Sequence, residues 1–262
     1  MGHVRLGTLP KTRAWKDVVR LIADGADPSE IAGATMKAAD KAFEAIQFDQ
    51  GYANTVNLMT QLAIAARLDD PRTHLESVGI NIPEQASLPD VALAVKKALD
   101  SSVSDKVSQS DFPELARDAL VGSVVEHMDE KFGNLFPPSA DDIHRGLADL
   151  GKKKEFGKFA RTFYKRLTNE SLEWFLSRTI GTQIGEGQRF ATTNQVAQFK
   201  QALEIHCHET SEIVERYCAD WFSKHHFENN GDIPKSKTKG FGAYAMQKMR
   251  DELKIRAAPD ES

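Results

Sequence analysis

Cysteine is scarce in this chain of 262 residues, which holds only Cys207 and Cys218. Both fall within one apolar pattern that predicts a helix. Eleven residues of continuous helix span about 16 Å, whereas the Cα atoms of a disulfide lie about 6 Å apart. The spacing therefore argues against a disulfide between these two residues. Free thiols are typical of a reducing compartment, so we expect a cytoplasmic protein.

Long apolar runs are also missing. No stretch approaches the roughly 18 residues that a membrane span requires, and the first ten residues, MGHVRLGTLP, lack the apolar core of a signal peptide. The chain starts Met1-Gly2, but Leu6 stands where a myristoylation signal needs Ser or Thr. We therefore expect neither a membrane span nor a lipid anchor.

The motifs of common enzymes are absent. The segment GTQIGEG (181–187) lacks the Lys and Ser/Thr of a phosphate-binding loop, and no Ser stands in a nucleophile elbow. His208 begins the sequence HETSE, in which Glu212 replaces the second His of the zinc-protease pattern. No Glu-x-x-His pair suggests a di-iron bundle. We expect no cofactor and lean against catalysis.

The weak metal candidates are His208 and Glu212. With Glu204 they follow the spacing i, i+4, i+8, which places all three on one line of a continuous helix. A metal would need further ligands from another helix. The alternative is an ordinary set of helix-surface contacts, and the neighbouring His206 and Cys207 fit a buried histidine with its hydrogen bonds satisfied and a structural thiol.

What the sequence does contain is helical periodicity. No window alternates with period two between turn signals, so we predict an all-α fold, a bundle of about eight to ten helices. The expected helices cover roughly 13–24, 28–48, 52–68, 88–99, 113–132, 139–151, 152–179, 196–227 and 243–255. Thr12, Asp27 and Ser139 are expected N-caps, and the run Asp27-Pro28-Ser29-Glu30 predicts a reciprocal capping box.

The two longest amphipathic patterns lie in the C-terminal half, at 152–179 and 196–227. The second has no Gly or Pro, and we expect one continuous helix that organises its half of the chain. Leu203, Ile213 and Tyr217 lie in its apolar stripe and should be buried.

Charge divides the chain. Residues 1–150 carry 15 Lys and Arg against 23 Asp and Glu, a formal charge of −8, whereas residues 151–262 carry 19 against 15, a formal charge of +4. The polar run 101–110 is a candidate linker. We expect an acidic helical part at 1–100 and a second part at 111–262 that is basic from 151 on, and the two can form one compact domain.

Four basic residues, which we call the basic stripe, are spaced more regularly than the other basic residues of the C-terminal half. Lys154, Lys158, Arg161 and Lys165 share a face of the helix expected at 152–179. Other basic residues extend this surface: Lys152, Lys153, Arg166, Lys235, Lys237, Lys239, Lys248, Arg250, Lys254 and Arg256. Such a surface suits phosphates or an acidic protein, or it is simply solvated.

These patterns favour a non-enzymatic helical interaction or adaptor protein, a subunit of a larger cytoplasmic assembly. Its partner is another protein or a second copy of the chain. The first alternative is a nucleic-acid-binding protein that uses the basic half, although no named binding module is present. The second is a metal-dependent enzyme centred on His208 and Glu212.

Overall fold

The computed structural model describes residues 12–46, 48–102, 112–132 and 137–256, which form twelve α-helices and no β-strand beyond an isolated bridge between Ile184 and Phe190. The first six are α1 (Arg13–Asp24), α2 (Pro28–Ala38), α3 (Asp40–Ile46), α4 (Gln50–Ala65), α5 (Pro71–Ser77) and α6 (Leu88–Ser102). The others are α7 (Phe112–Phe132), α8 (Ala140–Asp149), α9 (Lys153–Thr182), α10 (Thr193–Thr210), α11 (Glu212–Glu228) and α12 (Lys235–Arg256). The all-α class is confirmed, and the count exceeds the expected eight to ten. No helix of the described ranges is long and apolar enough to cross a membrane.

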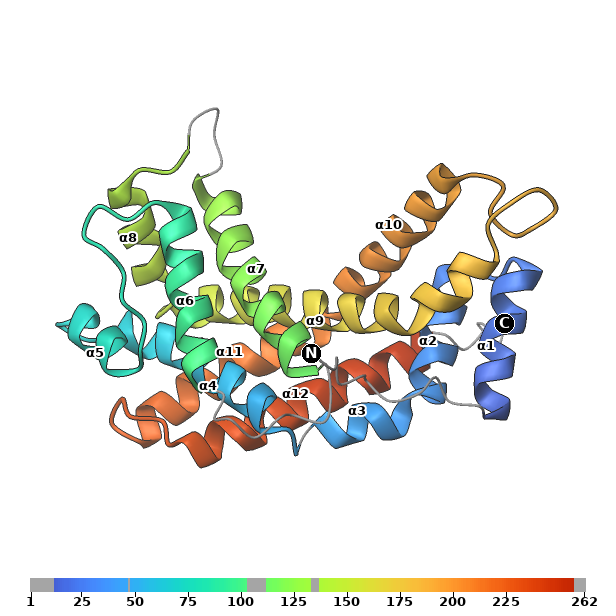
Figure 1. Cartoon of the computed structure of the whole chain (residues 1–262). Helices are drawn as coiled ribbons and strands as arrows, with labels where there is room; N and C mark the ends of the chain where they lie inside the picture. The colour runs from blue at the N-terminus through green and yellow to red at the C-terminus, as the bar shows by residue number, and fades with distance from the viewer. Residues whose placement is uncertain (1–11, 47, 103–111, 133–136, 257–262) are drawn as a thin grey trace.

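The central element is α9, which begins one residue after the predicted start and ends three residues beyond the predicted end. Its 30 residues span about 45 Å. It crosses the middle of the molecule in Figure 1, where α7 and α10 leave it in diverging directions. It packs against α2, α7, α10, α11 and α12, so it is buried along most of its length.

The prediction of one continuous helix over residues 196–227 is wrong. It divides into α10 and α11 at Ser211, where no Gly or Pro marks the break. The Thr210 hydroxyl donates to the carbonyl of His206 (2.7 Å) and the Ser211 hydroxyl to that of His208 (2.6 Å). Such bonds compete with the helical amide bonds. Leu203 is buried as expected, Tyr217 is half-buried, and Ile213 is 41% exposed because it follows the break.

The predicted caps are correct in two places of three. Thr12 accepts a hydrogen bond from the Trp15 amide (3.3 Å), and Ser139 forms a full capping box with Asp142. Asp27 does precede α2, but its side chain makes no capping bond, so the predicted capping box there is wrong.

Other boundaries also differ from the prediction, and α5 was not expected. The expected helix 28–48 divides at Ala39 into α2 and α3. The final helix starts at Lys235 rather than residue 243, because Gly242 lies inside it against α4. A Cβ at Gly242 would lie 3.0 Å from Val56 on α4. Gly242 therefore allows α12 and α4 to approach closely, and it does not mark a turn.

The N-terminal and C-terminal parts share one hydrophobic core, since α12 packs across α2 and α4. Stacked rings from α9, α11 and α12 continue it: Phe156 on Phe222 (centroids 4.4 Å apart) and Phe241 on Trp221 (4.1 Å). Of the expected linker, residues 103–110 lie outside the described ranges, and residues 101 and 102 end α6. Cys207 and Cys218 are buried free thiols.

Candidate functional site

The four residues of the basic stripe do not form one exposed surface. All four lie on α9, and Lys154 and Lys158 are exposed. Arg161 is half-buried and Lys165 is only 7% exposed. Exposure decreases from Lys154 to Lys165 because α7 and α10 pack over the middle of α9.

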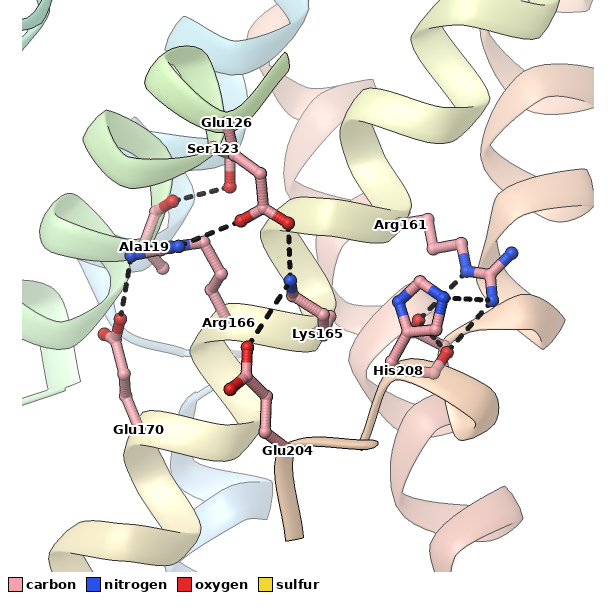
Figure 2. A network of polar contacts seen from close by, with 10 residues as sticks. Ala119, Ser123, Glu126, Arg161, Lys165, Arg166, Glu170, Glu204 and His208 are labelled. Atoms are coloured by element: carbon pink, nitrogen blue, oxygen red, sulfur yellow. Dashed lines mark hydrogen bonds and ion pairs between the residues drawn. The ribbon is translucent and has the colours of Figure 1, made fainter. Parts of the chain in front are cut away.

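Lys165 links three helices. Its Nζ lies 2.5 Å from Glu126 Oε1 on α7 and 3.8 Å from Glu204 Oε1 on α10. Figure 2 shows the ammonium group between the two carboxylates. A buried ammonium without a counter-charge would be strongly destabilising. Its role in the fold is therefore to join α7 and α10 to α9.

Arg166 extends this network along α7. Its Nη1 donates to Glu126 Oε2 (2.9 Å), and its Nη2 lies 4.0 Å from Glu170 Oε1. The guanidinium lies against Gly122, where any Cβ would come within 2.4 Å of Nε. Glycine at this point of α7 makes room for the arginine.

The two carboxylates of this network have opposite pKa shifts. Burial acts to raise the pKa of Glu126, but hydrogen bonds from Lys165 and Arg166 bring it below its ordinary value. Burial, together with the nearby charges of Asp118 and Glu173, raises the pKa of Glu170 to about 7, and Arg166 opposes this only in part. Glu170 therefore changes its charge near neutral pH.

Arg161 holds the junction of α10 and α11. Its guanidinium donates to the His208 carbonyl (3.1 Å), the Ser211 hydroxyl (3.3 Å) and Glu215 (2.9 Å). A cation at a helix C-terminus satisfies carbonyls that have no helical partner. Arg161 thus stabilises the junction of α10 and α11.

The metal candidates are not arranged as the sequence suggested. His208 ends α10 and Glu212 begins α11, so with Glu204 they are not three residues on one continuous helix. Arg161 Nη2 lies 3.3 Å from His208 Nε2, where its charge would repel a metal cation. Within the described ranges no group of three or more His, Cys, Asp or Glu side chains could hold a metal ion.

His206 is buried as expected, but it is not satisfied: its Nε2 has no hydrogen-bond partner among the described residues. Burial lowers its pKa and keeps the ring neutral. Burial also raises the pKa of the Cys207 and Cys218 thiols far above the ordinary value. Nucleophilic cysteine chemistry needs a thiolate at neutral pH, so neither thiol is suited to it.

Most of the additional basic residues have internal partners. Lys152 pairs with Asp149, Lys153 with Asp220, Arg250 and Lys254 with Asp40, and Arg256 with Glu252. Lys248 lies over the rings of Tyr217 and Tyr244. Lys235, Lys237 and Lys239 at the start of α12 are exposed and make no ion pair with any described residue.

Three of the predicted site residues, Lys154, Arg161 and Glu212, line a groove between α9 and α11. This groove, of about 650 Å³, is lined by Lys153, Lys154, Arg161, Glu212, Arg216 and Asp220, among others. Within the part of the chain that the structure describes, Lys154 and Glu212 have no ion-pair partner. The groove therefore carries one free charge of each sign.

A second groove of about 510 Å³ lies on the other side of α11 and shares Glu212, Arg216 and Asp220 with the first. Tyr217 lines it, and the Tyr217 ring packs edge-on against the half-exposed Tyr244 (5.0 Å). Sequence reasoning missed Arg216, Asp220 and Tyr244, since no local motif joins residues from α11 and α12.

No known protein-family model matches this chain, and comparisons with curated proteins and with solved structures find no significant similarity.

Proposed function

We propose that this chain is a helical interaction protein, without catalytic activity of its own, that binds another protein along α11. The observation that carries the proposal is the pair of adjoining grooves on either side of α11, which share Glu212, Arg216 and Asp220. Lys154 and Glu212 supply free charges of both signs, and Ile213 and Tyr244 add exposed apolar surface nearby. Interfaces between proteins commonly combine an apolar and aromatic centre with a polar rim.

Charge favours a protein partner over nucleic acid at this surface. A phosphate-binding surface needs cations that are free to replace counterions. Arg161 and Lys165 are neutralised by Glu215 and Glu126, and Lys153 by Asp220. Carboxylates in the same grooves would also repel a phosphate backbone. A protein surface with charges of both signs fits this pattern better.

The test is lysine-directed cross-linking of the full chain in its native host, followed by mass spectrometry. We expect cross-links from Lys153 or Lys154 to one recurrent protein, a second copy of the chain being one possible result. Lys154→Glu and Glu212→Lys should each abolish them. The matched controls, Lys97→Glu on α6 and Glu130→Lys on α7, change equally exposed side chains elsewhere and should retain the partner. Retention of the same partner by both groove variants would refute the proposal.

Nucleic-acid binding remains a second candidate because Lys235, Lys237 and Lys239 are exposed without ion-pair partners in the described ranges. Three phosphate contacts would lower the affinity for duplex by about 2.7 log units per log unit of salt. Binding of DNA or RNA with that salt dependence, lost when the three lysines become Glu, would favour this candidate. We expect no such binding.

A further inference from the structure

A separate cavity lies at the other end of the molecule from α1, between α4, α5, α8 and the segment 78–87. Its volume is about 400 Å³, within the roughly 300–1,000 Å³ typical of small-molecule sites. None of the residues that line it lines the grooves beside α11. It is thus independent of the proposed protein-binding surface.

The walls of this cavity are apolar. They include Leu62, Ala65, Leu75, Ile80, Ile82 and Leu147. The small side chains of Ala65, Ala66 and Ala148 leave space that larger residues would fill. Filling an apolar cavity with side-chain atoms normally stabilises a fold. A cavity that small alanine side chains leave open is therefore suited to an apolar ligand.

The polar residues that line the cavity give it a charge preference. Asp69 and Glu84 have no ion-pair partner among the described residues, whereas Arg72, the cation beside them, pairs with Glu76 (3.1 Å). His144 Nε2 makes a hydrogen bond with the backbone oxygen of Glu84 (3.0 Å), which ties α8 to the segment 78–87. The carboxylates of Asp69 and Glu84 are therefore available to contact the polar group of a ligand.

We propose that this cavity binds a small molecule with an apolar body and a protonated amino group. The apolar body would be removed from water between α4 and α8, and the ammonium group would lie near Asp69 and Glu84. A carboxylate or phosphate at the same place would be repelled by both residues. The ligand class is thus a hydrophobic amine rather than a fatty acid.

The test compares three probes with the same eight-carbon chain: octylamine, octanol and octanoate. Isothermal titration of the full chain at fixed ionic strength should give saturable binding, tightest for octylamine and weakest for octanoate. The double variant D69N/E84Q should weaken octylamine binding by about tenfold, the scale of a screened charge contact, and leave octanol unchanged. Both positions are exposed, so folding should be preserved.

Two further variants complete the design. Asp129→Asn with Glu130→Gln removes the same charge from exposed positions on α7 and should leave octylamine affinity unaltered. Ala148→Phe, or Ala66→Leu if the first does not fold, should block the apolar probes by filling the cavity. Failure of all three probes to saturate, octanoate binding as tightly as octylamine, or an equal loss in the α7 control would each overturn the proposal.

Discussion

The phenolic oxygen of Tyr52 on α4 donates a hydrogen bond to the carbonyl of Gly242 on α12, at 2.7 Å and across 190 residues of chain. The hydroxyl oxygen of Tyr164 on α9 lies 3.4 Å from the phenolic oxygen of Tyr52. Both tyrosines are fully buried. This contact joins the N-terminal part of the chain to its last helix.

Replacing Tyr52 with Phe should lower the free energy of unfolding by about 1–3 kcal/mol, because the Gly242 carbonyl and the Tyr164 hydroxyl lose a partner away from water. Urea denaturation followed by circular dichroism measures the change. Tyr244→Phe is the matched control, since that ring is half-exposed, and should alter stability by less than about 0.5 kcal/mol. Equal effects of the two changes would mean that the hydrogen bond contributes nothing.

Lys165 and Lys154 lie on the same helix and should respond very differently to substitution. Lys165→Met leaves Glu126 with Arg166 as its one remaining cation among the described residues, and should destabilise the fold by about 1–3 kcal/mol. Lys154→Met removes an exposed charge and should fall within about 0.5 kcal/mol of the unaltered protein. Denaturant titrations of both variants make the comparison, and a Lys165 variant of full stability would show that its ion pairs are not needed.

Glu170 should make the protein less stable as pH rises from about 4.5 to 7. Its pKa in the folded state is about 7, above its ordinary value of 4.5, so the folded protein binds this proton more tightly than the unfolded chain. The resulting loss of stability develops between about pH 4.5 and 7 and remains above pH 7. Glu170→Gln should therefore stabilise the protein at pH 8 by about 1–3 kcal/mol and have little effect at pH 4.5.

Thermal unfolding of the Glu170 variant and the unaltered protein, measured from pH 4.5 to 8, provides the data. The charges that face Glu170 are those of Arg166, Asp118 and Glu173. The difference between the two curves reports the titration of Glu170. A difference that is constant across the range would contradict the assigned pKa.

Leu203 and Ile213 were expected to behave alike, and the structure separates them. Leu203→Ala should destabilise the protein by about 2–5 kcal/mol because it leaves a cavity beneath α10. Ile213→Ala should cost less than about 1 kcal/mol, since 41% of the residue is already exposed. Chemical denaturation tests both, and a small effect at Leu203 would place α10 away from the core.

Periodicity and capping residues in the sequence were enough to predict the all-α class, the start of α9 to within one residue and the start of α1. Periodicity failed at Ser211 because the apolar spacing continues through the break and no Gly or Pro marks it. Lys154, Lys158, Arg161 and Lys165 all lie on α9. Which of them stay exposed depends on α7 and α10, whose packing no local pattern contains.

The position of α12 across α2 and α4 has a consequence for the time course of folding. At typical synthesis rates of about 5–20 residues per second, Gly242 is made roughly ten to forty seconds after Tyr52, which lies 190 residues earlier. During that delay, the faces of α2 and α4 that α12 covers have no partner to bury them. Until α12 is made, the nascent chain therefore exposes apolar surface on α2 and α4, and a holding chaperone that shields these two helices should raise the yield of native protein.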